Sequence, residues 1–132
     1  MAHSIQTYRG KTEVLNDLDL LIILGFALEI IRESSQFDSL QSLVMAWQQV
    51  PKMYGPGVID LKIDELVQTH AEVRELRTLL ETVLQRASKH HETIPAHVLK
   101  KIVMVPDIRF NDYRVEWVNE AVKKLQMLIA EQ

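Results

Sequence analysis

Histidines near residue 90 are the first side chains whose types could support chemistry, as metal ligands. His90, His91, Glu92 and His97 lie within eight residues, and imidazole and carboxylate groups both bind transition metals. A zinc protease motif, however, needs two histidines four residues apart on one helical face. Here four residues separate Glu92 from His97, and Pro95 interrupts the helix between them. The pattern favours a solvated helix end, and we expect neither a metal nor another cofactor.

Two further titratable side chains could act as an acid or a base. His70 lies one turn from Leu66, near the apolar stripe of a predicted helix, and a buried histidine can exchange protons near neutral pH. No nucleophile or carboxylate is identifiable as its partner, which favours a structural role. Glu29 is the only charge between Leu20 and Ile31, and the cost of burying an unpaired carboxylate places it where the helix meets water. We therefore predict no catalytic residues and a non-enzymatic protein.

Four acidic residues suggest recognition by charge instead. Asp64, Glu65, Glu72 and Glu75 fall on one long predicted helix, where Glu65 and Glu72 share a face because seven residues make about two turns. Charge runs of this kind usually face water. The alternative is an acidic strip for a basic partner, since complementary charge speeds encounter and excludes wrong partners.

Two irregular segments add aromatic contact candidates. Residues 51–57, PKMYGPG, hold two prolines and two glycines around Met53 and Tyr54, and methionine and aromatics are enriched at interfaces. A second such cluster, around the start of the last predicted helix, consists of Arg109, Phe110, Tyr113 and Arg114. Arginine beside aromatics suits contacts with proteins or anions. The predicted partner-binding residues are therefore Asp64, Glu65, Glu72, Glu75, Met53, Tyr54, Arg109 and Tyr113.

Composition narrows the class of protein. The chain has 132 residues, 47% of them hydrophobic and 25% charged, as in an ordinary globular domain. Cysteine is absent, which excludes disulfides and thiolate sites and is compatible with a cytoplasmic location. The net charge of −3 disfavours general nucleic-acid binding, because such binding depends on many basic contacts with phosphate. The Gly55-Pro56-Gly57 turn lacks the Lys-Ser/Thr of a phosphate-binding loop.

The element that must position these residues is an apolar run over 18–31, LDLLIILGFALEII. It has no charged or polar side chain between Leu20 and Leu28, so it lacks the wet face of a surface helix. A membrane span needs about 20 apolar residues, and this run is shorter. We therefore expect a buried central helix and no membrane association.

Helical periodicity and breakers predict the elements around this axis. Residues 1–10 lack apolar periodicity and are expected to be a loosely ordered entry segment, with Thr12 as a plausible N-cap. The third helix is expected to be the longest, with apolar residues at steps of seven from Leu66 to Ala87. In the last helix the predicted buried stripe includes Trp117. The predicted helices span about 12–33, 38–50, 60–90, 95–103 and 112–130, giving one all-α domain over 1–132.

These features together favour a small binding protein. The leading hypothesis is a cytoplasmic inhibitor of immunity or antitoxin type, which occludes a basic partner such as a nuclease toxin. The alternative is a helical regulatory or ligand-binding domain with a pocket near His70 or near Arg109–Arg114. Homodimerisation through the long helix is possible on this pattern.

Overall fold

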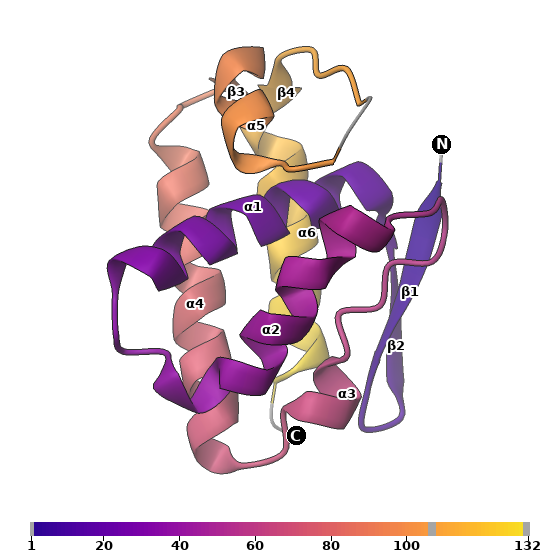
Figure 1. Cartoon of the computed structure of the whole chain (residues 1–132), viewed down its shortest axis with the longest axis vertical. Coiled ribbons are helices and arrows are strands. Elements are labelled where there is room, and N and C mark those ends of the chain that lie inside the picture. The colour runs from indigo at the N-terminus through magenta and orange to yellow at the C-terminus, as the bar shows by residue number, and fades with distance from the viewer. Residues whose placement is uncertain (1, 106–107, 131–132) are drawn as a thin grey trace.

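The computed structural model describes residues 2–105 and 108–130, and helices surround one central helix in it (Figure 1). That central helix is α1 (Asp17–Glu33), which packs against α4 (His70–Ser88) and α6 (Val115–Leu128) on one side. On its other sides lie α2 (Gln41–Gln49) and α5 (Ala96–Ile102). The remaining helical elements are short: two 3₁₀ turns, η1 (Asp38–Leu40) and η2 (Val50–Met53), and α3 (Ile63–Leu66).

The all-α prediction is wrong, because the chain opens with a β-hairpin. Strand β1 (His3–Tyr8) pairs antiparallel with β2 (Lys11–Asn16). The two residues between them, Arg9 and Gly10, have φ of 48° and 81°, as a type I′ hairpin turn requires. The predicted loose segment over 1–10 therefore contains a strand and the turn. The class of the protein is mixed α/β.

The hairpin escaped prediction because its buried face is largely polar. Ser4, Gln6 and Tyr8 are buried while the residues between them are exposed. This is the alternation of a half-buried strand, but none of the three inward side chains is aliphatic, and Ser4 and Gln6 are wholly polar. An apolar pattern search therefore sees no strand. A second antiparallel pair, β3 (Thr93–Ile94) with β4 (Tyr113–Arg114), is also absent from the prediction.

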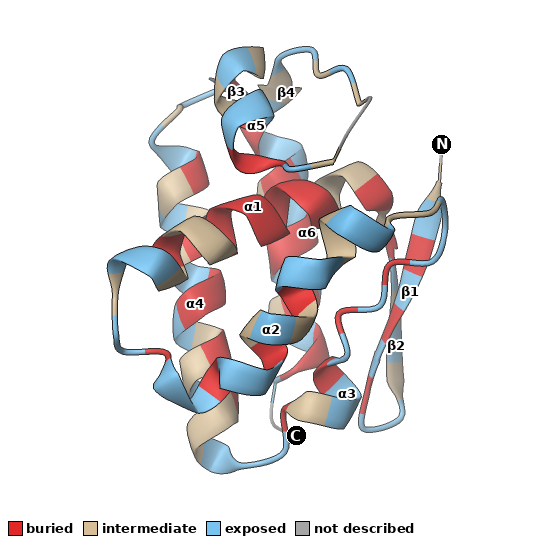
Figure 2. Ribbon diagram, viewed as in Figure 1, coloured by how far each residue is buried: buried red, intermediate tan, exposed pale blue. Residues whose placement is uncertain are grey.

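The central helix itself is buried as predicted. Every residue from Leu20 to Ala27 is buried, as the red band along α1 shows (Figure 2). Gly25 lies where α5 crosses α1, and a Cβ there would be 2.8 Å from the carbonyl oxygen of Ile102. Only glycine allows this close approach of two backbones. Within the described part of the chain, no helix is long and apolar enough to cross a bilayer.

The predicted long helix over 60–90 is divided in two. Helix α3 ends at Leu66, and α4 begins at His70 with Thr69 as its N-cap. The Thr69 hydroxyl accepts from the Glu72 backbone N–H, and the Glu72 carboxylate accepts from the Thr69 N–H. This arrangement is a capping box. It starts a new helix within a segment whose apolar spacing predicts a single continuous helix.

The other helix boundaries differ by a few residues. Helix α1 starts at Asp17 with Asn16 as its N-cap, not at Thr12, because 11–16 belong to β2. The predicted helix over 38–50 consists of η1, α2 and the start of η2. The helix expected over 95–103 is α5, and the last helix starts at 115 rather than 112, after β4.

Candidate functional site

The irregular segment 54–62, which we call the strap, is fastened to the hairpin by buried polar side chains. The Asp17 carboxylate is only 2% exposed and accepts hydrogen bonds from the Ser4 hydroxyl, the Tyr54 hydroxyl (3.2 Å) and the Gly57 backbone N–H (2.8 Å). The Ser4 Oγ in turn accepts from the Ile59 N–H at 3.0 Å. The strap backbone is thus bonded to side chains on the buried face of β1 and at the start of α1.

The side-chain amide of Gln6 and the indole of Trp47 complete the attachment of the strap. Gln6 donates from its Nε2 to the carbonyl oxygen of Ile59 at 2.7 Å and accepts from the Leu61 N–H at 2.9 Å. The indole Nε1 of Trp47, a buried residue of α2, donates to the Leu61 carbonyl at 2.8 Å. The strap backbone is therefore held from both sides, which fixes a segment without helix or strand hydrogen bonds.

Exposed apolar residues of the strap and of its neighbours η2 and β1 lie beside two hollows. Met53 is 76% exposed, Val58 69% and Ile5, on the neighbouring β1, 62%. One hollow of about 410 Å³ lies between α2 and the strap, and another of about 310 Å³ lies between β1 and α3. Both are lined by Asp60 and Lys62, so they adjoin. We call this surface the strap face, formed by Ile5, Thr7, Met53, Tyr54, Val58, Asp60, Lys62, Asp64 and Glu65.

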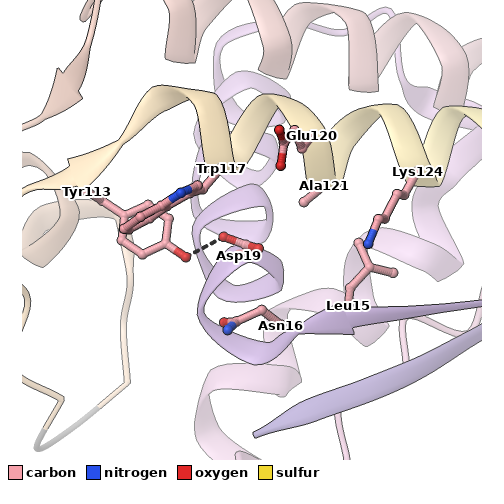
Figure 3. Close-up of a pocket in the computed structure, with 8 residues that line it drawn as sticks. All are labelled: Leu15, Asn16, Asp19, Tyr113, Trp117, Glu120, Ala121 and Lys124. Carbon is pink, nitrogen blue, oxygen red and sulfur yellow. Dashed lines mark hydrogen bonds between the residues drawn. The ribbon is translucent and has the colours of Figure 1, made fainter. Parts of the chain in front are cut away.

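A second candidate site, the Trp117 pocket, lies where the hairpin, α1 and α6 meet (Figure 3). Its volume is about 270 Å³. The Tyr113 hydroxyl donates to the Asp19 carboxylate, and the rings of Tyr113 and Trp117 meet edge to face with centroids 5.1 Å apart. The lining residues are Leu15, Asn16, Asp19, Tyr113, Trp117, Glu120, Ala121 and Lys124.

Burial changes the acid–base properties of the Asp19–Tyr113 pair. Desolvation raises the pKa of Asp19, and the hydrogen bond from Tyr113 and the charge of Lys124 reduce that rise. Burial and the neighbouring carboxylate of Asp19 also raise the pKa of the Tyr113 hydroxyl. Tyr113 therefore stays protonated and donates to Asp19 throughout the physiological pH range.

A third hollow lies near His70, where the sequence placed one of its alternative pockets. His70 is the first residue of α4 and is exposed, not at the core boundary. The hollow has a volume of about 320 Å³ and is also lined by Tyr8, Arg9 and Lys11. Lys11 donates to the carbonyl oxygens of Met127 and Ala130 at the end of α6. Its ammonium group thus ties the hairpin to a helix C-terminus.

Half of the predicted partner-binding residues come together. Met53, Tyr54, Asp64 and Glu65 all lie on the strap face, although they were predicted from separate segments. The break between α3 and α4, however, separates Asp64 and Glu65 from the other two acidic residues of the predicted strip.

The other predicted residues lie elsewhere. Glu72 serves the capping box of α4, and the Glu75 carboxylate accepts from the Ser39 N–H in η1 at 3.0 Å. Arg109 is exposed in the segment before β4. Tyr113 belongs to the Trp117 pocket. The one continuous acidic strip predicted along a long helix therefore does not exist.

Sequence reasoning missed the residue that gives the second pocket its name. Trp117 was predicted in the buried stripe of the last helix, yet it is 45% exposed. Val118 and Ala121 occupy the buried face instead. A signal was present: Trp117 is flanked by Glu116 and followed by Glu120 and Lys124 at helical spacing, which marks a polar face.

The histidine-rich segment does not assemble into a metal site. His90 lies against the ring of Phe26, with centroids 6.3 Å apart. His91 and His97 are exposed. No group of three or more histidine, aspartate or glutamate side chains in the described ranges is arranged to hold a metal ion.

Comparison of the chain with protein families, with curated proteins and with solved structures finds no match.

Proposed function

We propose that this protein is a non-enzymatic, cytoplasmic binding module whose strap face docks onto another protein. In its concrete form it is an inhibitor of immunity or antitoxin type that occludes a basic partner such as a nuclease toxin. The observation that carries the proposal is a rigidly fastened irregular segment that exposes Val58, next to the exposed Met53 at the end of η2.

Rigid attachment is what distinguishes this surface from an ordinary loop. Binding through a mobile loop loses affinity because ordering its side chains and backbone opposes association. The strap is already ordered by the side chains of Ser4, Gln6, Asp17 and Trp47. Apolar side chains on a preorganised segment can enter a partner's pocket with little further loss of entropy.

The charges around the apolar residues favour a basic partner. Asp60, Asp64 and Glu65 line the hollow between β1 and α3, and Lys62 is its only lining cation among the described residues. An acidic rim attracts and orients a partner with a basic face. Apolar anchors within a charged rim are the usual arrangement of a protein interface.

The test begins with capture of the partner from lysate of the protein's own host on the immobilised chain. Dissociation constants are then measured for two variants of the strap face. Met53→Ser combined with Val58→Ser removes the apolar anchors, and Glu65→Lys reverses a charge that has no structural hydrogen bond at its carboxylate in the described residues. Each should weaken binding about tenfold or more.

Matched controls place the same changes elsewhere. Met127→Ser alters a methionine of α6 that is 68% exposed, and Glu92→Lys reverses an exposed acid before β3. Both controls should bind like the parent chain. Equal affinities for the strap-face and control variants would refute the proposal.

A further inference from the structure

The Trp117 pocket is built by elements that do not contribute to the strap face. Asp19 comes from α1, Leu15 from β2, Tyr113 from β4, and Trp117, Glu120 and Lys124 from α6. At about 270 Å³ it is slightly smaller than the pockets of about 300 Å³ and more that hold drug-sized molecules. Its size suits a small metabolite.

Opposite charges occupy different parts of this pocket. The two aromatic rings lie at one end and Lys124 at the other, with Asp19 and Glu120 between them (Figure 3). Glu120 and Lys124 have the four-residue spacing of a helical ion pair. None of the ion pairs found among the described residues joins them. Their charges are thus separated along the pocket.

We propose that the Trp117 pocket binds a small zwitterion, a free amino acid, between these charges. The ammonium group of the ligand lies beside Asp19 and Glu120, and its carboxylate lies beside Lys124. Its side chain contacts the exposed ring of Trp117. Leu15 and Ala121 add apolar surface to the pocket lining.

A ligand with a single charge fits this lining less well. Lys124 would repel a plain amine, and Asp19 with Glu120 would repel a plain carboxylate. A zwitterion pairs with both ends, and charge-assisted hydrogen bonds are the stronger kind.

The two tryptophans of the chain allow a local measurement. The indole Nε1–H of Trp47 is buried and bonded to Leu61, whereas Trp117 is 45% exposed in the pocket. We would titrate the ¹⁵N-labelled full chain with each of the standard free amino acids and follow both indole signals by NMR. At least one amino acid should shift the Trp117 signal saturably and leave the Trp47 signal in place.

Two ligand analogues test the zwitterion requirement. The N-acetyl form of the best amino acid lacks the cation, and its methyl ester lacks the anion. Each should bind about tenfold or more weakly than the amino acid, as expected for loss of one charged hydrogen bond. An ester that binds as well as the parent amino acid would overturn the zwitterion in favour of a plain amine.

Variants on the exposed face of α6 locate the site without disturbing the core. Lys124→Gln and Glu120→Gln should each weaken binding about tenfold, while Lys123→Gln, an exposed neighbour, should not. Failure of every amino acid to shift the Trp117 signal would overturn the proposal. So would binding that is unchanged in both pocket variants. Neither result bears on the strap face, which shares no residue with this pocket.

Discussion

Asp17 and Asp19 stand two residues apart in the first turn of α1, and each holds a different part of the chain by hydrogen bonds. Asp17 holds the strap, and Asp19 holds the segment that leads into α6. Each accepts a hydrogen bond from a tyrosine, Tyr54 in the first case and Tyr113 in the second. Both carboxylates thus perform the same kind of structural attachment from the same helix end.

Their surroundings differ in how completely each carboxylate is satisfied. Asp17 is buried and accepts from three donors, so it has little capacity for another partner. Asp19 is half-buried, accepts from Tyr113 and faces a pocket. A carboxylate saturated by the protein supports the fold, whereas one with remaining acceptor capacity at a pocket wall can also bind a ligand.

The largest expected effect is loss of the Asp17 carboxylate. Asp17→Ala leaves the Ser4 and Tyr54 hydroxyls and the Gly57 N–H without their acceptor, so the free energy of unfolding should fall by about 3–5 kcal/mol. Denaturant unfolding measures this loss, and hydrogen exchange should show faster opening at Gly57 and Ile59. Asp19→Ala is the comparison and should cost about 1–2 kcal/mol. Equal losses in the two variants would contradict the inference that the Asp17 carboxylate has its hydrogen bonds satisfied and the Asp19 carboxylate does not.

A smaller effect is expected from removing the tyrosine hydroxyl at the second attachment. Tyr113→Phe should lower the free energy of unfolding by about 1–2 kcal/mol at neutral pH. It should also raise the pKa of Asp19 further, because the hydrogen bond from Tyr113 holds that pKa down.

The sign of the pH effect follows from burial. The pKa of Asp19 is higher in the folded state than in the unfolded chain, so its ionisation lowers stability as pH rises through that interval. Tyr113→Phe widens the interval, and its cost should therefore be greater at neutral pH than in acid. An NMR titration of Asp19 in both chains measures the shift. A pKa that falls in Tyr113→Phe would show that the hydroxyl does not stabilise the carboxylate.

The smallest effect concerns Glu72, an acid that also accepts backbone N–H groups but lies near the surface. Its hydrogen bonds with Thr69 hold the pKa of Glu72 below its usual range. The ionised form therefore adds stability above about pH 4, which is lost as pH falls through the lowered pKa. Glu72→Gln should cost a few tenths of a kcal/mol at pH 7 because solvent screens the group. Thermal unfolding should show no difference near pH 2, and a constant difference would exclude ionisation as its cause.

Helical periodicity predicted the buried parts of this molecule well because burial there is apolar. The run over 20–27 and the stripe through Val73, Leu80 and Ala87 are buried as expected. The hairpin was missed because Ser4 and Gln6 face inward to bind the strap, and polar residues do not mark a buried strand in a sequence. The split between α3 and α4 was missed although the capping pattern Thr69-x-x-Glu72 is present, since apolar spacing continues across it.

The sequence predicted the residue types of the candidate sites better than it predicted where those residues lie in the fold. The residue types of Met53, Tyr54, Asp64 and Glu65 mark them as contact candidates, but only the hydrogen bonds of the strap bring them to one surface. Such bonds join residues more than fifty positions apart, from Ser4 to Ile59 and from Gln6 to Leu61. Local pattern carries no information about pairs so distant.

The close contact between Gly25 and α5 links the core to the position of one wall of the Trp117 pocket. Helix α5 lies against Gly25, and the chain continues from α5 toward β4, where Tyr113 forms one wall of the pocket. Any side chain at position 25 would push α5 outward. A substitution at position 25 is therefore expected to reposition Tyr113 and to change which zwitterion the proposed site selects, although no residue that lines the pocket is altered.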